Sequence, residues 1–575
     1  MTSFYNKQRT RIGIVFISFI GLWIIIVARL FFLQFVLETE TTAKFISEVS
    51  SKANRGIIYD RNGEELTINV TQYDFWVRTT DKIDKKGIAT LFSSTFNKPV
   101  KYYINKLKPI SKYIVLERNV LDNNCSEIIN NWRKRPEGLQ KDKVISRQYP
   151  FNELAAQTIG YINKNNTGSL GLESYFEDIL KGEDGKITMD KNSNNTTHRS
   201  LIADQNEAID GADLYLTLDI EYQSILQSEL KNAVEKRNSK SGQAVLINPN
   251  TGEILAIATV PSFNPNKYGN FSIDLQKNLV ISDAYEPGST FKIVGVSSAI
   301  EENRLNWADT FDCENGEYIY NSHKFHDHEA KDTLTISEIL VHSSNIGMVK
   351  ISDFIGSKLI YKYVKDFGFG SKTEIQLPTE NSGLLRKYSD WSALSAPEVS
   401  IGQEISATTL QTAMAYCVIA NGGFLLKPRI IKSINYPDGT EYSKTEAIRK
   451  VISPETCDSL LIALEDVVKN GTATKAQING YRVAGKTGTA QKFVDGKYSN
   501  NQFISSFAGI FPANNPELVC VVSIDSPQYG FHWGNETAAP VAKNVFEQII
   551  NMSDKFEPEY NLEKHYFAEK QELLK

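Results

Sequence analysis

The feature that most restricts how this chain can fold is an apolar run near its N-terminus, residues 12–28. These 17 residues include no charged side chain, and after Arg29 the chain continues with the apolar letters LFFLQFVL. A helix of about 20 apolar residues crosses the hydrocarbon core of a bilayer. A cleaved signal peptide is the alternative, but no small-x-small cleavage site follows and large side chains persist. The sequence therefore predicts one uncleaved transmembrane anchor over residues 12–37.

Charges on the two sides of this run predict its orientation. Lys7, Arg9 and Arg11 precede it, and Glu38 and Glu40 follow it. Basic residues favour the cytoplasmic side, so we expect the N-terminus in the cytoplasm and the bulk of the chain outside. Arg29 has two interpretations that remain open: it reaches to the outer interface, or it contacts another membrane protein.

The remaining chain has an ordinary globular composition. With 575 residues there is room for two or three domains. A formal net charge of −5 gives no basic footprint, so nucleic acid is not an expected partner. Five widely spaced cysteines without a Cys-x-x-Cys pair argue against a disulfide framework and against a zinc site.

Local signals in the C-terminal two thirds predict strands and helices in a definite order. A strand over 214–219 ends near Asp219, which is placed to cap a helix over 220–236. Two further strands form a hairpin with a longer loop, and helical segments follow before three more strands and a last helix. The segments are strands 243–247, 253–258, 486–491, 503–511 and 518–524, and helices 408–419 and 540–551. This order predicts an α/β (α+β) layer arrangement with an antiparallel sheet.

The candidate reactive centre is residues 285–292, with the sequence YEPGSTFK. The Pro-Gly pair suits a turn, and the apolar run after it suits a helix that starts at or near Ser289. Lys292 would then lie one turn from Ser289. A desolvated lysine with a lowered pKa is a base that can activate a serine. Ser228 and Lys231 have the same spacing, but we interpret them as part of a surface helix.

Two later motifs distinguish the first pair from the second. Ser343 and Asn345 stand at Ser-x-Asn spacing, and Lys486 opens a Lys-Thr-Gly triplet within residues 483–490. The order Ser-x-x-Lys, Ser-x-Asn, Lys-Thr-Gly is the signature of the active-serine penicillin-binding proteins and β-lactamases.

With these motifs, the chain resembles a class B penicillin-binding protein. Three N-terminal stretches resemble that class's pedestal motifs: RGIIYDRNG at 55–63, RQYP at 147–150 and GSLGLE at 168–173. The resemblance implies a five-stranded antiparallel sheet with helices on both faces and a helical insert. It also implies a domain order: cytoplasmic tail 1–11, anchor 12–37, β-rich dimerisation-type pedestal 38–210, transpeptidase domain 211–552 and charged tail 553–575. No stretch resembles a glycosyltransferase domain, so a bifunctional class A protein is not expected.

The resemblance further implies a peptidoglycan D,D-transpeptidase and gives each catalytic residue a role. Ser289 is the expected nucleophile and Lys292 its base. Ser343 is expected to relay a proton, Asn345 to hold the substrate amide, and Lys486 to supply positive charge.

The residues after Lys486 are the expected substrate-binding group. Thr487, Gly488 and Thr489 would meet the terminal carboxylate and the extended peptide, which pairs with this strand. No cofactor is expected. His326, Asp327 and His328 suggest a metal, but histidines two apart in a polar loop are more often solvated, so no metal is predicted either.

The expected partners are stem peptides, β-lactams, the membrane, a SEDS-type glycosyltransferase and other division proteins. Residues 285–288, 400–403 (SIGQ) and 506–513 are more similar to the septal than to the elongation type. The alternatives are an elongation-type enzyme, a carboxypeptidase or β-lactamase that passes the acyl group to water, a β-lactam sensor, and a non-catalytic division scaffold.

Overall fold

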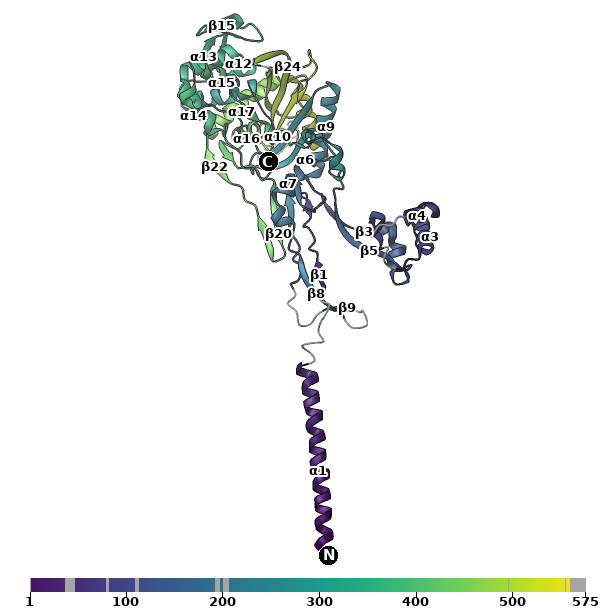
Figure 1. Ribbon diagram of the computed structural model, residues 1–575. Coiled ribbons are helices and arrows are strands. Elements are labelled where there is room, and N and C mark those ends of the chain that lie inside the picture. The colour runs from purple at the N-terminus through teal and green to yellow at the C-terminus, as the bar shows by residue number, and fades with distance from the viewer. Residues whose placement is uncertain are drawn as a thin grey trace, which may run out of the picture. The chain divides into compact units, whose positions relative to one another are not determined.

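The computed structural model describes residues 2–36, 47–78, 82–108, 113–191, 197–199, 206–494, 496–553 and 555–558. The chain forms two compact units (Figure 1). The first comprises residues 1–54 and 182–210, and the second comprises residues 55–181 and 211–575. The predicted limits at 37/38, 210/211 and 552/553 remain predictions, and most of the predicted tail 553–575 lies outside the described residues.

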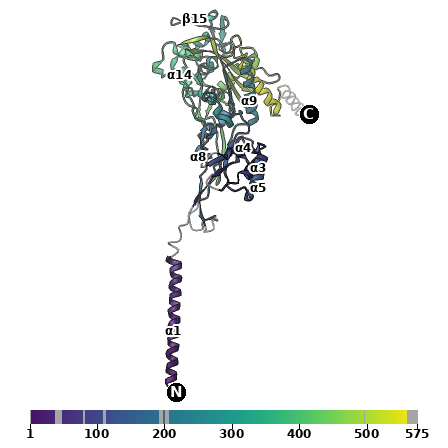
Figure 2. The same cartoon turned by 45° about the vertical axis from the view of Figure 1, so that its right-hand side comes forward.

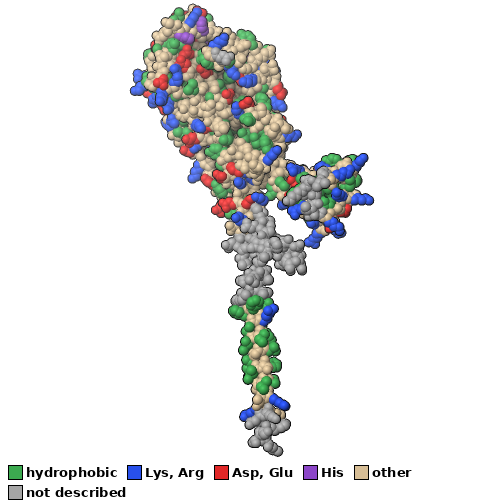
Figure 3. Space-filling view, in the orientation of Figure 1, with side chains coloured by type: hydrophobic (Ala, Val, Ile, Leu, Met, Phe, Trp, Pro, Cys, Tyr) green, Lys and Arg blue, Asp and Glu red, His purple; other side chains and the backbone are tan. Residues whose placement is uncertain are grey.

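The N-terminal apolar run forms one long helix. Helix α1 spans Thr2–Phe31 and continues as a short π-helix, Phe32–Val36. Residues Gln8–Gln34 are long and apolar enough to cross a membrane, and this segment is the single such candidate among the described residues. Its hydrophobic side chains face outward (Figure 3). The helix passes through Arg29, whose guanidinium lies 6.0 Å from the centre of the Phe32 ring. It also begins inside the predicted tail 1–11, because nothing in that polar segment breaks a helix.

Within the second unit, a small subdomain has a hydrophobic core of its own. Its sheet has the order β4-β3-β5, with strands β3 (Ile68–Arg78), β4 (Tyr113–Leu121) and β5 (Leu139–Gln148). Helices α3 (Lys85–Phe96), α4 (Val100–Lys106) and α5 (Asp122–Asn130) lie together beside it (Figure 2). The predicted β-rich pedestal therefore also contains helices that the sequence analysis did not identify.

Two further sheets involve the predicted pedestal. Strand β1 (Ser47–Ser51) pairs with β8 (Gly185–Lys191), which pairs with β9 (Thr197–Arg199). Strand β2 (Ile58–Tyr59) pairs with β10 (Asp213–Leu216), and β10 pairs with β20 (Ile431–Tyr436) and through it with β21 (Gly439–Tyr442). This sheet takes strands from both sides of the predicted 210/211 limit. The chain turns between Tyr59 and Glu65, where Gly63 has φ +95°.

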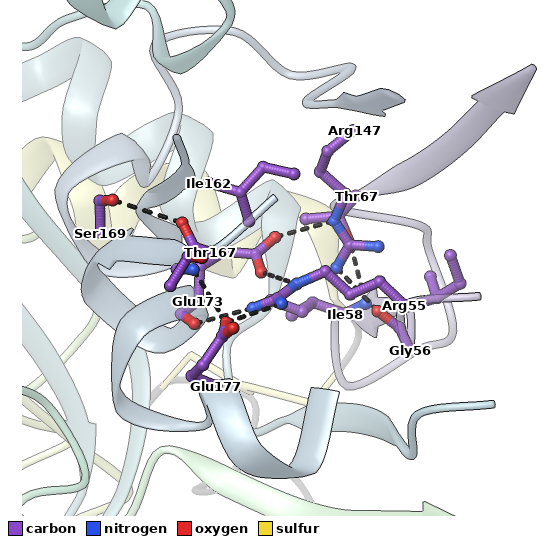
Figure 4. A network of polar contacts seen from close by, with 12 residues as sticks. Arg55, Gly56, Ile58, Thr67, Arg147, Ile162, Thr167, Ser169, Glu173 and Glu177 are labelled. Carbon is purple, nitrogen blue, oxygen red and sulfur yellow. Dashed lines mark hydrogen bonds and ion pairs between the residues drawn. The ribbon is translucent and has the colours of Figure 1, made fainter. Parts of the chain in front are cut away.

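The three pedestal motifs meet in a buried network of charges (Figure 4). Glu173 accepts from Arg55 Nε at 2.6 Å through one oxygen and from Arg147 Nε at 2.8 Å through the other. Arg55 also pairs with Glu177 at 2.7 Å, and Arg147 donates to the Gly56 carbonyl at 2.7 Å. The side chains of Arg55, Arg147 and Glu173 are almost fully buried. Three segments far apart in the sequence are thus joined by charge-assisted hydrogen bonds.

The C-terminal two thirds is built on a five-stranded antiparallel sheet of order β12-β11-β25-β24-β23. The strands are β11 (Ser241–Asn248), β12 (Glu253–Val260), β23 (Ala484–Val494), β24 (Lys497–Phe511) and β25 (Leu518–Asp525). Helices α9 (Ile220–Lys236) and α18 (Ala538–Met552) pack on this sheet, and so do α16 (Thr409–Ala420) and α17 (Pro454–Lys469). All the predicted strands and helices of this region are present, but the strand predicted over 214–219 ends at Leu216, and β23 and β24 extend beyond their predicted ends.

A helical insert lies between β12 and β23. It contains α11 (Lys292–Glu301), α12 (Ile336–Val341), α13 (Asn345–Ile355), α14 (Ser357–Asp366) and α15 (Ser395–Ser400). A hydrophobic core continuous with that of the sheet holds this insert in place. All five cysteines are buried and free, so they serve as small core residues.

Candidate active site

Ser289 stands on the first turn of the helix predicted from its sequence. That turn is a 3-10 helix, Gly288–Phe291, which continues directly into α11. The backbone N–H of Gly288 donates to the Gly402 carbonyl at 3.1 Å. A side chain at position 402 would place its Cβ 2.2 Å from the Gly288 oxygen, and Gly402 has φ +81°. The SIGQ motif therefore supports the turn that presents Ser289, because only glycine permits this approach.

Lys292 is fully buried below Ser289. Its amine donates to the Ser343 carbonyl and, at 2.8 Å, to Asn345 Oδ1. The amine also lies 3.2 Å from Ser343 Oγ. Burial lowers the pKa of Lys292 to about 7, and the Asp327 carboxylate opposes this shift. A large fraction of the amine is therefore neutral near pH 7 and has a lone pair that can accept a proton.

Ser343 Oγ lies between two buried lysines. It is 3.2 Å from Lys292 Nζ and 2.9 Å from Lys486 Nζ. Ser343 adopts φ +59°, the left-handed region that costs a non-glycine residue about 1–3 kcal/mol. The conformation turns the chain between α12 and α13. It occurs at the one residue whose hydroxyl contacts both amines, among the residues described.

Lys486 is also fully buried. Burial, and after it the charge of Lys292, lowers the pKa of Lys486 well below its ordinary value. Neither amine forms an ion pair with a described carboxylate; their hydrogen-bond partners are oxygens of Ser343, Asn345 and Thr487. Two cationic groups that share one hydroxyl cannot both keep their protons easily, so this cluster favours the neutral form of an amine.

Helix α13 positions the Ser-x-Asn motif, and Asp327 holds its first turn. Asp327 accepts a hydrogen bond from Ser344 Oγ at 2.5 Å and others from the backbone N–H groups of Asn345 and Ile346. A carboxylate at a helix N-terminus is stabilised by exactly these unpaired donors and by the helix dipole. The sequence analysis considered Asp327 only as a metal ligand. Its partners lie 17 to 19 residues away, so no local pattern indicated this role.

The Lys-Thr-Gly triplet lies on β23, the edge strand of the sheet. Thr487 Oγ1 lies 3.0 Å from Thr472 Oγ1, and Thr489 Oγ1 accepts from the Gly534 N–H at 3.2 Å. At Gly488 an added Cβ would lie 2.4 Å from Ser506 Oγ and 2.9 Å from the Pro287 carbonyl. Gly488 therefore lets the edge strand pass close to the turn before Ser289.

These residues surround a cleft of about 490 Å³. Its lining includes Ser289, Ser343, Asn345, Thr487 and Thr489, while Lys292 and Lys486 lie behind this surface. Other lining residues include His328, Thr472 and Trp533. The rings of His328 and Trp533 are 4.4 Å apart. The sequence analysis considered His328 only as a metal ligand, and no sequence signal distinguished Thr472 and Trp533 from other polar and aromatic surface residues.

The motif of His326, Asp327 and His328 does not form a metal site in the described part of the chain. No group of three or more His, Cys, Asp or Glu side chains there is placed to hold a metal ion. The His326 carbonyl accepts from Asn345 Nδ2 at 2.9 Å, and Asp327 is bound to α13. The second Ser-x-x-Lys match, Ser228 and Lys231, lies on the exposed face of α9, as predicted.

Comparison with known families decides how this arrangement is classified. A model of the penicillin-binding protein transpeptidase domain matches residues 242–547, and a model of the penicillin-binding protein dimerisation domain matches residues 50–216. The chain is a class B penicillin-binding protein. As a member of this family it is a serine D,D-transpeptidase. Its fold is the penicillin-binding transpeptidase fold, preceded along the chain by a pedestal domain.

Named relatives extend over nearly the whole of this penicillin-binding protein. It is 32% identical over 557 residues to stage V sporulation protein D of Bacillus subtilis, covering 94% of this chain and 85% of the relative. It is 30% identical over 514 residues to the peptidoglycan D,D-transpeptidase FtsI of Escherichia coli, covering 88% and 84%.

Solved structures of penicillin-binding proteins share its fold. Penicillin-binding protein 3 of Mycobacterium tuberculosis, in complex with aztreonam, superposes with a TM-score of 0.69 at 26% identity, over 89% of this chain and 99% of that one. Penicillin-binding protein 2X of Streptococcus thermophilus gives 0.77 at 24% identity, over 88% and 80%.

Proposed function

We propose that this chain is a membrane-anchored transpeptidase that crosslinks peptidoglycan stem peptides through an acyl-enzyme on Ser289, during septal cell-wall synthesis. The observation that carries the proposal is the position of Ser289 in one cleft with Ser343, Asn345 and Thr489, above two buried lysines. Relatives named peptidoglycan D,D-transpeptidases support the substrate.

The first half of the reaction makes the acyl-enzyme. Ser289 Oγ attacks the carbonyl carbon between the two terminal D-alanines, and its proton passes to the neutral amine of Lys292. The backbone N–H groups of Ser289 and Thr489 hold the resulting oxyanion, a stabilisation of about 3–4 kcal/mol for each donor. The C–N bond then breaks. Ser343, in contact with both lysines, relays a proton to the departing nitrogen, and D-alanine leaves.

The second half transfers the acyl group. The amine of another stem peptide attacks the ester carbon, loses a proton to the same relay, and Ser289 leaves with its hydroxyl restored. Asn345 and the free edge of β23 hold the extended peptide, and Lys486 with Thr487 and Thr489 attracts its terminal carboxylate. A β-lactam would acylate Ser289 in the same way and remain bound.

Fluorescent penicillin tests the nucleophile. The protein purified in detergent should give a covalent band on a denaturing gel, and Ser289→Ala should give none. Ser228→Ala is a matched control, because Ser228 and Lys231 repeat the spacing on an exposed helix and should be irrelevant to labelling. A band that decays within minutes would indicate a β-lactamase, and no band from folded wild-type protein would favour the scaffold.

The septal role rests on residues 285–288, 400–403 and 506–513 and on the relationship to division proteins such as FtsI. We propose that the N-terminus is cytoplasmic, that the bulk of the chain lies outside the membrane, and that α1 and the pedestal contact a SEDS-type glycosyltransferase. A fluorescent fusion should gather at the division site. Uniform distribution along the lateral wall would instead indicate the elongation role.

A further inference from the structure

The small subdomain that contains β3, β4 and β5, residues 68–148, differs in charge from the rest of the chain. It has 16 Lys and Arg but 8 Asp and Glu, whereas the whole chain has a formal net charge of −5. Lys and Arg side chains project from its outer edge, at the right of Figure 3. The residues that line the catalytic cleft all lie outside this subdomain, so acyl transfer does not account for its charge.

Most of these positive charges have no acidic partner. Lys82 pairs with Glu137 at 3.7 Å and Lys98 with Glu117 at 2.7 Å. Most of the other basic residues are exposed and form no ion pair with a described residue, among them Lys85, Lys86, Lys101, Arg118, Arg133 and Lys134. Together these six residues form the basic surface of the subdomain. An excess of unpaired cations attracts an anionic partner.

The densest part of the basic surface follows Trp132. Arg133, Lys134 and Arg135 succeed this residue directly in the sequence, and all three are exposed. The Arg135 guanidinium lies 4.8 Å from the centre of the Trp132 ring, and Lys141 Nζ lies 4.6 Å from it. The two cations and the indole are held together by cation–π contacts, so apolar area and positive charge lie side by side.

Helix α4 carries a second group of this kind. Val100 and Tyr102 are 41% and 42% exposed. The amines of Lys98 and Lys106 lie 5.4 Å and 5.3 Å from the centre of the Tyr102 ring. Trp and Tyr are enriched where proteins meet the headgroup layer of a membrane, and basic residues beside apolar ones bind anionic lipids. The two groups therefore have the composition of a surface that lies against a bilayer.

The chain itself keeps this subdomain near a membrane. The segment that can cross a bilayer ends at Gln34, and the subdomain starts next to Arg55, whose carbonyl accepts from Asn69 Nδ2 at 2.6 Å. Residues 35–54 join these two points and span at most about 70 Å when fully extended. Because the anchor makes a contact with the bilayer intramolecular, even a weak attraction is sufficient.

We propose that the basic surface binds the anionic phospholipid headgroups of the membrane that holds α1. The inference uses the anchoring by α1 and does not depend on the acyl-transfer reaction. Lys and Arg side chains meet the lipid phosphates, while Tyr102 and Trp132 enter the headgroup layer. This contact limits the movement of the second unit about its tether.

Energy transfer to the bilayer tests the contact in the full-length protein. All five native cysteines are buried, so Asn124→Cys, on the exposed side of α5, offers one site for a membrane-impermeant donor dye. The protein is reconstituted in phosphatidylcholine vesicles with and without phosphatidylglycerol, each containing an acceptor lipid. We expect more transfer with phosphatidylglycerol. The difference should disappear in about 1 M salt, where charges are screened beyond about 3 Å.

A triple variant, Arg133→Gln with Lys134→Gln and Arg135→Gln, tests the residues. Each basic side chain at an anionic surface shifts the binding equilibrium about fivefold, so three shift it about 100-fold. Transfer should therefore fall to the level of the neutral vesicles. The matched control neutralises three exposed lysines of the catalytic domain that form no ion pair with a described residue: Lys358, Lys365 and Lys387. It should keep the preference for phosphatidylglycerol.

Equal transfer in neutral and anionic vesicles overturns the inference, and this comparison needs no variant beyond the labelled protein. Equal loss of transfer in the triple variant and in its control overturns the assigned surface. Soluble polyphosphate is added as a competitor. If it changes the transfer where phosphatidylglycerol does not, the surface binds a soluble polyanion and the bilayer contact is wrong. Fluorescent penicillin labels each preparation in parallel and reports that its catalytic domain is folded.

Discussion

Among the described residues, cationic side chains are buried in two places, and their hydrogen-bond partners differ between the two. In the pedestal, Arg55 and Arg147 are bonded to the carboxylate of Glu173. In the catalytic domain, Lys292 and Lys486 are equally buried, yet their hydrogen bonds go to hydroxyl, carbonyl and amide oxygens. Burial lowers the pKa of Arg55, but Glu173 and Glu177 outweigh it and raise that pKa overall. At Lys292, burial prevails and lowers the pKa to about 7.

This difference shows which buried charges hold structure together and which are available for chemistry. A guanidinium stays charged in proteins, so its burial requires carboxylate partners. A lysine left without such partners releases its proton instead and becomes a base. The pedestal arginines therefore stay charged and join segments of the chain, whereas burial favours the neutral form of Lys292 and Lys486.

The largest expected effect comes from replacing Lys292 by an arginine, which keeps its proton as the pedestal arginines do. Lys292→Arg keeps a positive charge but removes the neutral form. We expect the rate of Ser289 acylation by fluorescent penicillin to fall by about 100- to 10,000-fold, the range typical for loss of a general base. Stopped-time gel labelling measures the rate. A fall of less than threefold in folded protein would show that another group takes the proton.

The reverse experiment removes the shared carboxylate of the pedestal. Glu173→Gln leaves Arg55 with Glu177 and leaves Arg147 without a carboxylate partner among the described residues, and we expect a loss of about 3–5 kcal/mol in the free energy of unfolding. Denaturant unfolding of the detergent-solubilised protein measures it. Glu177→Gln is the control, because that side chain is 18% exposed and should cost less. Equal losses in the two variants would contradict the central place of Glu173.

The smallest effect is a dependence on pH that the pedestal should not share. With a pKa of about 7 for Lys292, the neutral fraction rises from about one tenth at pH 6 to about nine tenths at pH 8. We expect the acylation rate to rise about tenfold over that range and then level off. A flat profile would mean that Lys292 is not the base.

Asp327→Asn sharpens the same measurement. Asp327 opposes the lowering of the Lys292 pKa, so its removal should move the midpoint of the profile to lower pH. The lowered pKa of Lys292 also makes the stability of the fold depend on pH. Because the folded pKa of Lys292 lies below its ordinary 10.5, the unfolded chain binds more protons between about pH 7 and 10.5, and stability contributed by this group rises with pH in that window.

Much of the catalytic domain was predictable because its signals are local. Helix α9 has the predicted bounds, and its Asp219 cap accepts from the backbone N–H of Glu221 at 3.0 Å. The five strands follow apolar runs bounded by turn residues. Motif order indicated the site residues, although the amine of Lys292 turned out to bond Ser343 and Asn345 rather than Ser289.

Tertiary contacts were not predictable in the same way. Arg55 and Glu173 are 118 residues apart, and neither motif contains a local pattern that indicates the other as its partner. Asp327 caps α13 from another loop. The residues packed around Glu286 leave one of its carboxylate oxygens buried without a hydrogen-bond partner in the described chain. Helices α3 to α5 were not identified: α4 and α5 are short, but α3 has 12 residues and buries Ile88, Ala89 and Phe92 at helical spacing, a local signal that could have been used.

The position of Arg55 in the chain has a consequence for where the second unit begins. The first stretch of the first unit ends at Asn54, and Arg55 is the first residue of the second unit. Arg55 is bonded there to two carboxylates and a carbonyl, one of those carboxylates 118 positions later in the chain. A protein shortened to begin after Arg55 would therefore leave Glu173 with an ion pair to Arg147 alone among the described residues.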